Sequence, residues 1–196
     1  MTIRFATNDD TPIILDVYAP FITDTVITFE YEIPSLDEFS SRIETIQQQL
    51  PYLVAEEEGR ILGYAYASKH RDRIAYQWSV DISVYIHPEG HRQGIGRQLY
   101  TTLLALLREQ GYYNVYAGIT IPNPKSEGFH RSMGFEPVGV YTNVGYKFGH
   151  WHSVIWLSLI LQPYSPTPTP PLPITALSAE TVRPILSATS KQIIER

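Results

Sequence analysis

The chain has 196 residues, of which 43% are hydrophobic and 18% are charged, and it carries a formal net charge of −5. This composition is typical of a globular protein with a sizeable core, so global disorder is excluded, and no apolar run is long enough to span a membrane. The chain has no cysteine, which excludes disulfides, thiol nucleophiles and cysteine metal ligands, and its acidic balance argues against a nucleic-acid partner. Residues 1–5 lack the basic and apolar regions of a secretory signal, so we expect a cytoplasmic protein whose partner is a small molecule.

The first 86 residues are predicted to contain two helices and four strands. Residues 9–18 begin with acidic caps and a proline, which is typical of a helix start. A second helix is expected over residues 35–48, because Ser35 and Glu38 have the spacing of a capping box. Residues 58–59, Glu-Gly, form a predicted hairpin turn. The strands are expected over residues 3–6, 52–57, 60–69 and 76–86.

The second half of the domain is predicted to alternate between helices and strands. The longest helix is expected between Gly94 and Gly111, because its apolar residues recur on one side. The remaining elements are a strand over 115–121, a short helix over 124–133, and strands over 135–141 and 151–161. Together these elements predict an α+β domain over residues 1–162, with a central mixed, mostly antiparallel sheet flanked by helices.

Residues 163–196 are predicted to form a proline-rich C-terminal tail. The run from Gln162 to Pro173 has the composition of a polyproline-like segment, lying against the domain or hanging free. Farther on, helices are expected over residues 179–186 or 187–194, with Pro184 interrupting any longer one. We assign the tail no function from its sequence.

The most informative segment is a strand that leads into a glycine-containing turn and then into the long helix. Ile82, Val84 and Ile86 alternate with polar residues, and Gly94 and Gly96 lie where the helix begins. A helix N-terminus has unpaired N–H groups and a partial positive charge, so these residues predict a phosphate-binding site. The segment is not a P-loop, because no Lys-Ser/Thr pair follows. It is not a dinucleotide fingerprint, because a leucine stands where the third small residue belongs.

Several blocks of the sequence resemble a known family. The Gly-x-Gly turn is similar to the acetyl-coenzyme A loop of the GNAT superfamily, and the whole domain resembles the phosphinothricin and methionine sulfoximine N-acetyltransferases. The block Gly145–His152 is the most specific, since it lies outside the shared coenzyme loop. The seven blocks are Thr25–Phe29, Tyr76–Asp81, Val84–Ile86, Gly96–Tyr100, Ile121–Asn123, Phe129–Phe135 and Gly145–His152.

The resemblance implies a GNAT fold that binds acyl-coenzyme A in the cleft between its central strands. It also implies an acetyl-coenzyme A-dependent enzyme that acetylates the α-amino group of a small amino acid or toxic analogue, without a metal and commonly as a homodimer. The absence of cysteine favours direct transfer to the amine. The alternatives are acetylation of a polyamine or peptide, and a coenzyme A-binding module without catalysis.

Two residues are candidates for proton transfer. Asp81 matches the position where the family usually has glutamate as proposed base, and its shorter side chain favours relay through a water. Alternatively, Asp81 faces solvent or pairs with Arg71 or Arg73. His130 matches the family's histidine and could move protons in either direction, so its role as acid or base stays open. A lone histidine on a helix also has a structural interpretation.

Other site residues follow from the resemblance. Main-chain groups at the helix start are expected to bind the diphosphate, with Arg97 in reach, although His91 replaces the usual glutamine or arginine. A main-chain N–H of the preceding strand would stabilise the oxyanion. Asn123 caps its helix or binds the coenzyme. The full set of expected coenzyme contacts is Val84, Tyr85, Ile86, His91, Arg92, Gln93, Gly94, Ile95, Gly96, Arg97 and Asn123.

The acceptor's carboxylate is expected to bind an arginine fork. Arg73 matches the family position and Arg71 is its possible substitute, whereas Phe29 and Thr120 are candidates for contact with the acceptor's side chain. His150 and His152 could ligate a metal, but without a third ligand we expect packing beside the intervening tryptophan and no metal site.

Overall fold

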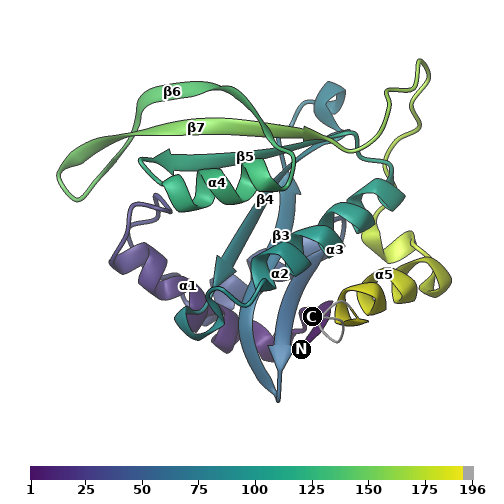
Figure 1. Cartoon of the computed structure of the whole chain (residues 1–196), viewed down its shortest axis with the longest axis horizontal. Helices are drawn as coiled ribbons and strands as arrows, with labels where there is room; N and C mark the ends of the chain where they lie inside the picture. Colours follow the sequence, from purple (N-terminus) through teal and green to yellow (C-terminus); the bar gives the residue numbers. More distant parts are fainter. Residues whose placement is uncertain (192–196) are drawn as a thin grey trace.

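The structure is a computed structural model that describes residues 1–191. A seven-stranded sheet forms its centre, with the strand order β1-β2-β3-β4-β5-β7-β6 (Figure 1). Within the described residues, β4 and β5 are the one parallel pair, and the other neighbours are antiparallel. The predicted mixed α+β class is therefore confirmed. The strands are β1 Thr2–Phe5, β2 Tyr52–Glu57, β3 Arg60–Lys69, β4 Ser79–Ile86, β5 Asn114–Ile121, β6 Glu136–Lys147 and β7 His150–Ile160.

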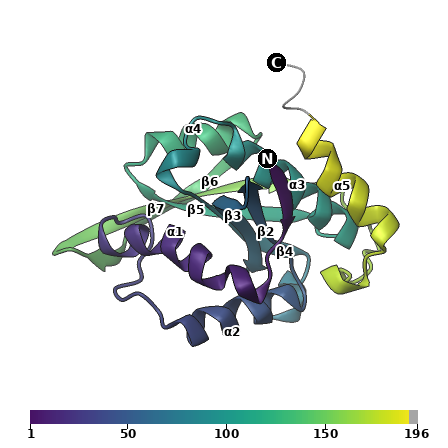
Figure 2. The same cartoon turned by 90° about the horizontal axis from the view of Figure 1, so that it is seen from below.

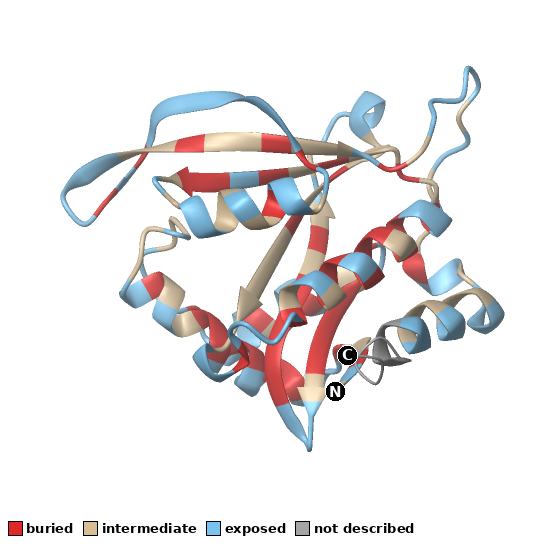
Figure 3. Cartoon of the chain, in the orientation of Figure 1, coloured by how far each residue is buried: buried red, intermediate tan, exposed pale blue. Residues whose placement is uncertain are grey.

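Helices cover both faces of the sheet. Figure 2 shows α1 and α2 on one side and α3, α4 and α5 on the other. Each side has its own apolar core, one built around α3 and one around α1 and α2. The buried residues run along α3 and the strands beneath it (Figure 3). The helices are α1 Thr11–Thr23, α2 Leu36–Gln47, α3 Ile95–Gln110, α4 Pro124–Ser132 and α5 Ala179–Lys191.

The local signals at the predicted caps and turns are confirmed. Ser35 Oγ accepts a hydrogen bond from the Glu38 N–H at 3.3 Å, and a Glu38 carboxylate oxygen accepts from the Ser35 N–H at 2.9 Å. The hairpin turn between β2 and β3 lies at Glu58 and Gly59, both with positive φ. The long helix begins after Gly94 and ends before Gly111, as its glycines predict.

Three element boundaries were predicted wrongly. Helix α1 continues to Thr23 with Pro20 inside it, because its buried face extends to Ile22. The predicted strand from residue 76 begins only at Ser79, after a 3₁₀ turn over Ile74–Tyr76. Strand β6 continues to Lys147, six residues beyond the predicted end. After an irregularity beyond Tyr141, its partner β7 pairs with it again over residues 145–147, and this pairing is a long-range property that local composition does not reveal.

The C-terminal tail packs against the domain. The Leu172 N–H donates to the Gln110 main-chain oxygen at 2.8 Å, and the Gln110 side chain donates to the Leu172 oxygen at 2.7 Å. The Trp78 indole donates to the main-chain oxygen of residue 169 at 2.8 Å. Ile174 is buried in the core on the α3 side. Of the two alternatives, the tail therefore lies against the domain.

The expectation that Pro184 interrupts the last helix was wrong. Helix α5 contains Pro184 and continues to Lys191, although a proline removes one helical hydrogen bond. Val182, Ile185 and Leu186 pack against the core, and this burial offsets the lost bond. The last residues of the alternative segment, 192–194, lie outside the described residues.

The central strands diverge in a way that positions the site. Strands β4 and β5 pair only from Ser79 to Asp81 and from Asn114 to Tyr116. Beyond that point β4 still pairs with β3, and β5 still pairs with β7 (Figure 1). The facing edges over residues 82–86 and 117–121 therefore lack a strand partner. Their main-chain groups are available to a ligand placed between them.

No described helix combines the length and the apolar composition that crossing a membrane would require.

Candidate active site

A cleft of about 70 Å³ lies between the diverging strands. Its walls come from β4, β5 and the first turns of α4, and Tyr100 of α3 closes one side. Several residues predicted to contact the coenzyme or the acceptor line it, which places these candidates together. They are Val84, Tyr85, Thr120, Asn123 and His130.

The N-terminus of α3 follows β4 after a 3₁₀ turn over Pro88–Gly90 and residues 91–94. Gly94 is the N-cap with φ of +77°, and the first bond within the helix runs from the Gln98 N–H to the Gly94 oxygen at 3.1 Å. The N–H groups of residues 95–97 therefore have no acceptor within the helix. Ile95 is 1% exposed and anchors the first turn in the core. These amides, together with the helix dipole, form a site suited to an anionic phosphate.

The side chains around this turn are tied to their neighbours. His91 Nε2 lies 3.2 Å from the Ile86 oxygen, and Gln93 donates to the Glu89 oxygen at 2.7 Å. Arg97 Nη2 donates to Ser132 Oγ at 2.7 Å, which links the start of α3 to the end of α4. Arg92 is exposed and has φ of +64°. The turn thus presents its main chain to the cleft while its side chains brace the surrounding loops.

Asn123 caps α4 through its Oδ1, which accepts from the Ser126 N–H at 3.2 Å. The cap uses the carbonyl end of the amide. Because Asn123 also lines the cleft, its NH₂ group is free to donate to a ligand while the cap stays intact. The two roles proposed for this residue are therefore compatible.

Asp81 lies at the apex of the divergence, the last residue of β4 that pairs with β5. Its Oδ1 is 2.6 Å from Nδ1 of His70. Burial raises the pKa of the Asp81 carboxyl, while the hydrogen bond and charge of His70, and the charge of Arg71, act in the opposite direction. The carboxylate therefore has a specific partner within the protein.

His70 was missed by sequence reasoning. It follows β3, in which Ser68 pairs with Asp81, so a residue two positions later lies on the same face of the sheet. The register between β3 and β4 is the signal that would have found it. That register depends on the pairing of two strands and is not evident from either strand alone.

Aromatic side chains surround this pair of residues. The His70 ring stacks on Tyr116 with centroids 4.4 Å apart, and the Tyr76 and Trp156 rings meet it edge-on, each at 6.2 Å. Trp156 covers Gly118, where a Cβ atom would lie 3.3 Å from the indole. The indole Nε1 is buried without a hydrogen-bond partner in the described residues.

His130 is buried, 4% exposed, at the back of the cleft. Its Nδ1 is 2.8 Å from the Ser126 main-chain oxygen, which can only accept, so Nδ1 carries the proton. The Tyr100 hydroxyl then donates to Nε2 at 3.1 Å. Burial lowers the pKa of His130, and the bond to Ser126 opposes that shift. His130 is therefore a neutral imidazole whose Nε2 accepts a hydrogen bond from Tyr100, and both residues line the cleft.

The family-specific block Gly145–His152 anchors the loop between α1 and α2. Lys147 is 1% exposed, and its Nζ donates to the Ile22 oxygen at 2.7 Å and the Thr28 oxygen at 2.8 Å. The Tyr31 hydroxyl donates to the main-chain oxygen of Tyr146. Burial lowers the pKa of the Lys147 ammonium, and Glu30 raises it. Sequence reasoning recognised the block without this structural role.

The other residues predicted to contact the acceptor are Phe29, Arg71 and Arg73. The Phe29 ring packs on Gly145 and lies 6.2 Å from the His152 ring. Arg71 is exposed and donates to the His70 main-chain oxygen at 2.7 Å. Arg73 is the exposed N-cap of the 3₁₀ turn before β4.

The two C-terminal histidines do not form a metal site with other side chains. His152 Nε2 lies 3.0 Å from the Lys147 main-chain oxygen, and His150 is exposed. In the described part of the chain, no group of three or more His, Asp and Glu side chains could hold a metal ion.

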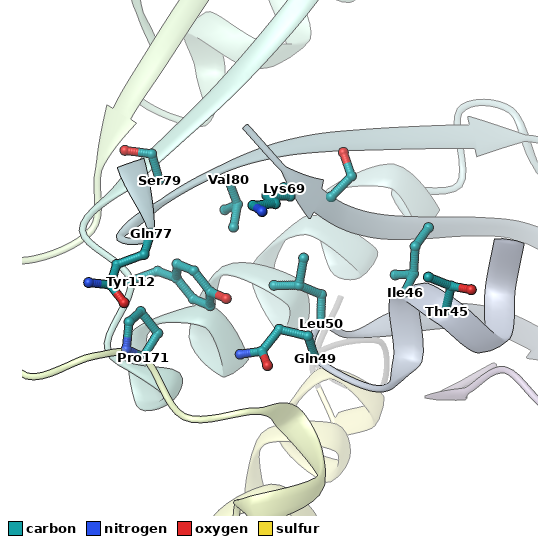
Figure 4. Close-up of a pocket in the computed structure, with 11 residues that line it drawn as sticks. Thr45, Ile46, Gln49, Leu50, Lys69, Gln77, Ser79, Val80, Tyr112 and Pro171 are labelled. Carbon is teal, nitrogen blue, oxygen red and sulfur yellow. The ribbon is translucent and has the colours of Figure 1, made fainter. Parts of the chain in front are cut away.

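A larger cavity lies elsewhere in the described structure. It has a volume of about 490 Å³ and lies between the end of α2, the start of β4 and the proline-rich tail (Figure 4). Leu50, Val80 and Tyr112 form its apolar part, while Gln49 and Lys69 lie at its edges. It contains none of the predicted site residues. The chemistry of the lining, and not the volume, therefore locates the candidate active site in the smaller cleft.

Comparisons with known proteins identify the family of the chain. Residues 3–156 match the family model described as an acetyltransferase (GNAT) domain. Over 171 residues, the chain is 36% identical to a phosphinothricin N-acetyltransferase from Streptomyces viridochromogenes, covering 87% of this chain and 93% of that protein. It is 32% identical to an L-methionine sulfoximine/L-methionine sulfone acetyltransferase from Salmonella typhimurium, covering 84% of this chain and 97% of that one.

A solved structure gives the same result. A GNAT superfamily phosphinothricin acetyltransferase from Sinorhizobium meliloti, in complex with AcCoA, superposes with a TM-score of 0.82 at 34% identity, covering 87% of this chain and 94% of the other. The expected resemblance and fold are thereby confirmed. The chain belongs to the GNAT acetyltransferase family and is an N-acetyltransferase.

Proposed function

We propose that the enzyme transfers the acetyl group of acetyl-coenzyme A directly to the α-amino group of a small amino acid or toxic analogue of the phosphinothricin or methionine sulfoximine type. The observation that carries this proposal is the cleft itself. The free edge of β4 that borders it leads from the partly buried carboxylate of Asp81 toward the helix start at Gly94, whose free amides suit an anion.

The coenzyme would lie along the free edge of β4. Its diphosphate would accept hydrogen bonds from the amides of residues 95–97, with Arg92 and Arg97 adding positive charge nearby. Its pantetheine amides would pair with main-chain groups of Val84 and Ile86, as an added strand would. This path directs the thioester toward the apex at Asp81. A main-chain N–H there would stabilise the tetrahedral oxyanion.

The acceptor would approach from the other face of the sheet, where α1 and α2 lie. Arg71 or Arg73 would bind its carboxylate, and Phe29 and Thr120 would limit the space for its side chain. An α-ammonium group must lose a proton before nitrogen can attack the thioester. Direct attack within a ternary complex needs no protein nucleophile, in keeping with a chain that has no cysteine. In this arrangement the neutral His130 would orient the Tyr100 hydroxyl, and the departing thiolate would take its proton from the attacking nitrogen.

The test is release of free thiol from acetyl-coenzyme A with a panel of acceptors. We expect turnover with phosphinothricin, methionine sulfoximine or methionine sulfone, and mass spectrometry should place the acetyl group on the α-nitrogen. Blocking that nitrogen by methylation should abolish turnover. Exclusive turnover of spermidine or of short peptides would contradict the proposal, and coenzyme binding without any turnover would favour a non-catalytic module.

We also propose that two copies associate through β6, the exposed edge strand of the sheet. An edge strand with free main-chain groups and apolar side chains is normally covered. The exposed apolar side chains of β6 are Val138, Val140, Tyr141, Val144 and Tyr146. We place the homodimer in the cytoplasm, because acetyl-coenzyme A is a charged intracellular metabolite that does not cross membranes unaided.

Sedimentation velocity tests this association. We expect a dimer for the unmodified protein and a monomer for Val138→Lys, since a charge would be buried at the contact. Ile13→Lys is the matched control, because Ile13 is an exposed apolar residue on α1, away from β6. A monomer at all concentrations for the unmodified protein would contradict the proposal.

A further inference from the structure

We propose that His70 is the base of the acetyl transfer and that Asp81 orients it. The inference rests on the proposed function and names a residue for its proton-transfer step. In this assignment the imidazole takes the place of the water relay that the short aspartate would otherwise require.

The geometry assigns a tautomer to His70. An ionised carboxylate only accepts, so the 2.6 Å contact with Asp81 Oδ1 places the proton on Nδ1. The opposite nitrogen, Nε2, is left with its lone pair. Nε2 has no hydrogen-bond partner among the described residues and is not fully buried, so it reaches solvent. A carboxylate that fixes one imidazole nitrogen so that the other can accept a proton is the arrangement used in serine hydrolases.

The surroundings hold the ring in place. His70 stacks on Tyr116 of β5, and Tyr76 and Trp156 contact it edge-on from the turn before β4 and from β7. The imidazole side chain is 13% exposed, so it is positioned by packing while one edge stays accessible. Tyr116 is also the β5 partner of Asp81, so the pair lies at the apex to which the cleft leads.

The charged and titratable groups around the ring favour this role. Asp81 faces it from β4, Tyr116 from β5 and Tyr76 from the 3₁₀ turn. Phenol groups are uncharged near neutral pH, so Asp81 supplies the negative charge that stabilises an imidazolium. Arg71 bonds to the His70 main-chain oxygen, and its positive charge limits that effect. An imidazole with one ring nitrogen held by a carboxylate and the other free is a common general base.

The proton and electron pairs balance without a further reagent. The acceptor's ammonium group gives one proton to His70 Nε2 and becomes an amine. The amine nitrogen forms a bond to the thioester carbonyl carbon, and the C–S bond then breaks with its electron pair on sulfur. The nitrogen loses a second proton as the thiolate gains one, and the imidazolium releases its proton to solvent.

The first experiment compares pH profiles of kcat/KM for an acceptor that the unmodified enzyme acetylates. Activity requires the neutral imidazole, so kcat/KM of the unmodified enzyme should rise with pH. His70→Asn keeps an N–H donor for Asp81 but has no proton acceptor at the Nε2 position. We expect a loss of about 100- to 10,000-fold and a profile without that rise.

Chemical rescue separates a base from a positioning residue. His70→Ala opens a space beside Tyr116 that added imidazole can enter. We expect imidazole to restore part of the activity, and substituted imidazoles of higher pKa to restore more at equal occupancy. His150→Ala is the matched control, because His150 is an exposed histidine remote from the apex and should leave both rate and profile unchanged. Unfolding curves of each variant verify that it is folded.

Proton NMR, which needs no turnover, tests the hydrogen bond between His70 and Asp81. We expect a far-downfield imidazole N–H proton resonance that Asp81→Asn and His70→Asn both abolish. If His70→Asn keeps the same rise with pH, or if His70→Ala does not respond to imidazole, His70 is not the base and the inference is overturned. An unmodified enzyme that acetylates no amine would instead overturn the proposed function.

Discussion

Gly94→Ala should weaken coenzyme A binding by roughly 10- to 100-fold, the equivalent of losing one or two hydrogen bonds to a charged group. Gly94 has φ of +77°, a conformation that costs an alanine about 1 kcal/mol. A Cβ at this position meets no protein atom within 4 Å, so the substitution causes no clash inside the protein. The loss would instead come from a turned main chain, which redirects the amides of residues 95–97, and from a methyl group facing the diphosphate.

Gly59→Ala is the matched control for this variant. Gly59 also has φ of +77° with nothing within 4 Å of a Cβ, but it lies in the hairpin turn between β2 and β3. Both variants should lose about 1 kcal/mol of unfolding free energy. Only Gly94→Ala should lower coenzyme affinity in isothermal titration calorimetry. Equal affinities for the two variants would show that the diphosphate binds elsewhere, and the proposed coenzyme position would then be wrong.

Gly145→Ala should destabilise the protein by about 1–3 kcal/mol and raise the acceptor's KM at least tenfold. A Cβ on Gly145 would lie 2.2 Å from Cε2 of Phe29 and 2.5 Å from its Cζ, so the ring must leave its position. Phe29 belongs to the loop between α1 and α2, which Lys147 and Tyr31 also tie to β6. Displacing the ring loosens that loop on the acceptor side of the sheet. Urea unfolding and steady-state kinetics measure the two effects.

The same strand offers a control for Gly145. A Cβ on Gly139 would meet nothing within 4 Å, so Gly139→Ala should change stability by less than about 0.5 kcal/mol. Removing the obstructing ring tests the cause directly. In a Phe29→Ala background, Gly145→Ala should cost much less than it does alone, which appears as a coupling energy in a double-mutant cycle. Additive effects would mean that Phe29 is not the group that requires glycine here.

The turn at Gly94 and the loop that packs on Gly145 flank the divergence of β4 and β5 from opposite sides of the sheet. Because β4 and β5 diverge after Asp81, the coenzyme can enter from the α3 side and the acceptor from the side of α1 and α2. The reacting groups would then meet at the apex, where Asp81 and His70 lie. A single irregularity in strand pairing thus explains why the candidate site is at this position in the sheet.

The elements with strong local signals could be predicted from the sequence. The capping box at Ser35, the hairpin turn at Gly59 and the glycines that bound α3 depend on a few adjacent residues, and each is present in the structure. The alternating residues of β4 and the glycine turn after it predicted the start of α3 for the same reason, and anion binding there stays a prediction. Backbone conformation and hydrogen bonding over a turn or two are properties of the local sequence.

Contacts between distant segments were decided only by the tertiary structure. His70 meets Asp81 because β3 and β4 pair in one register, and Lys147 reaches the carbonyl of Ile22 across the fold. The helix through Pro184 forms because burial against the core outweighs a local penalty. In each case the energy comes from packing and pairing between residues far apart in the chain. Composition and spacing in any one segment carry no information about that energy.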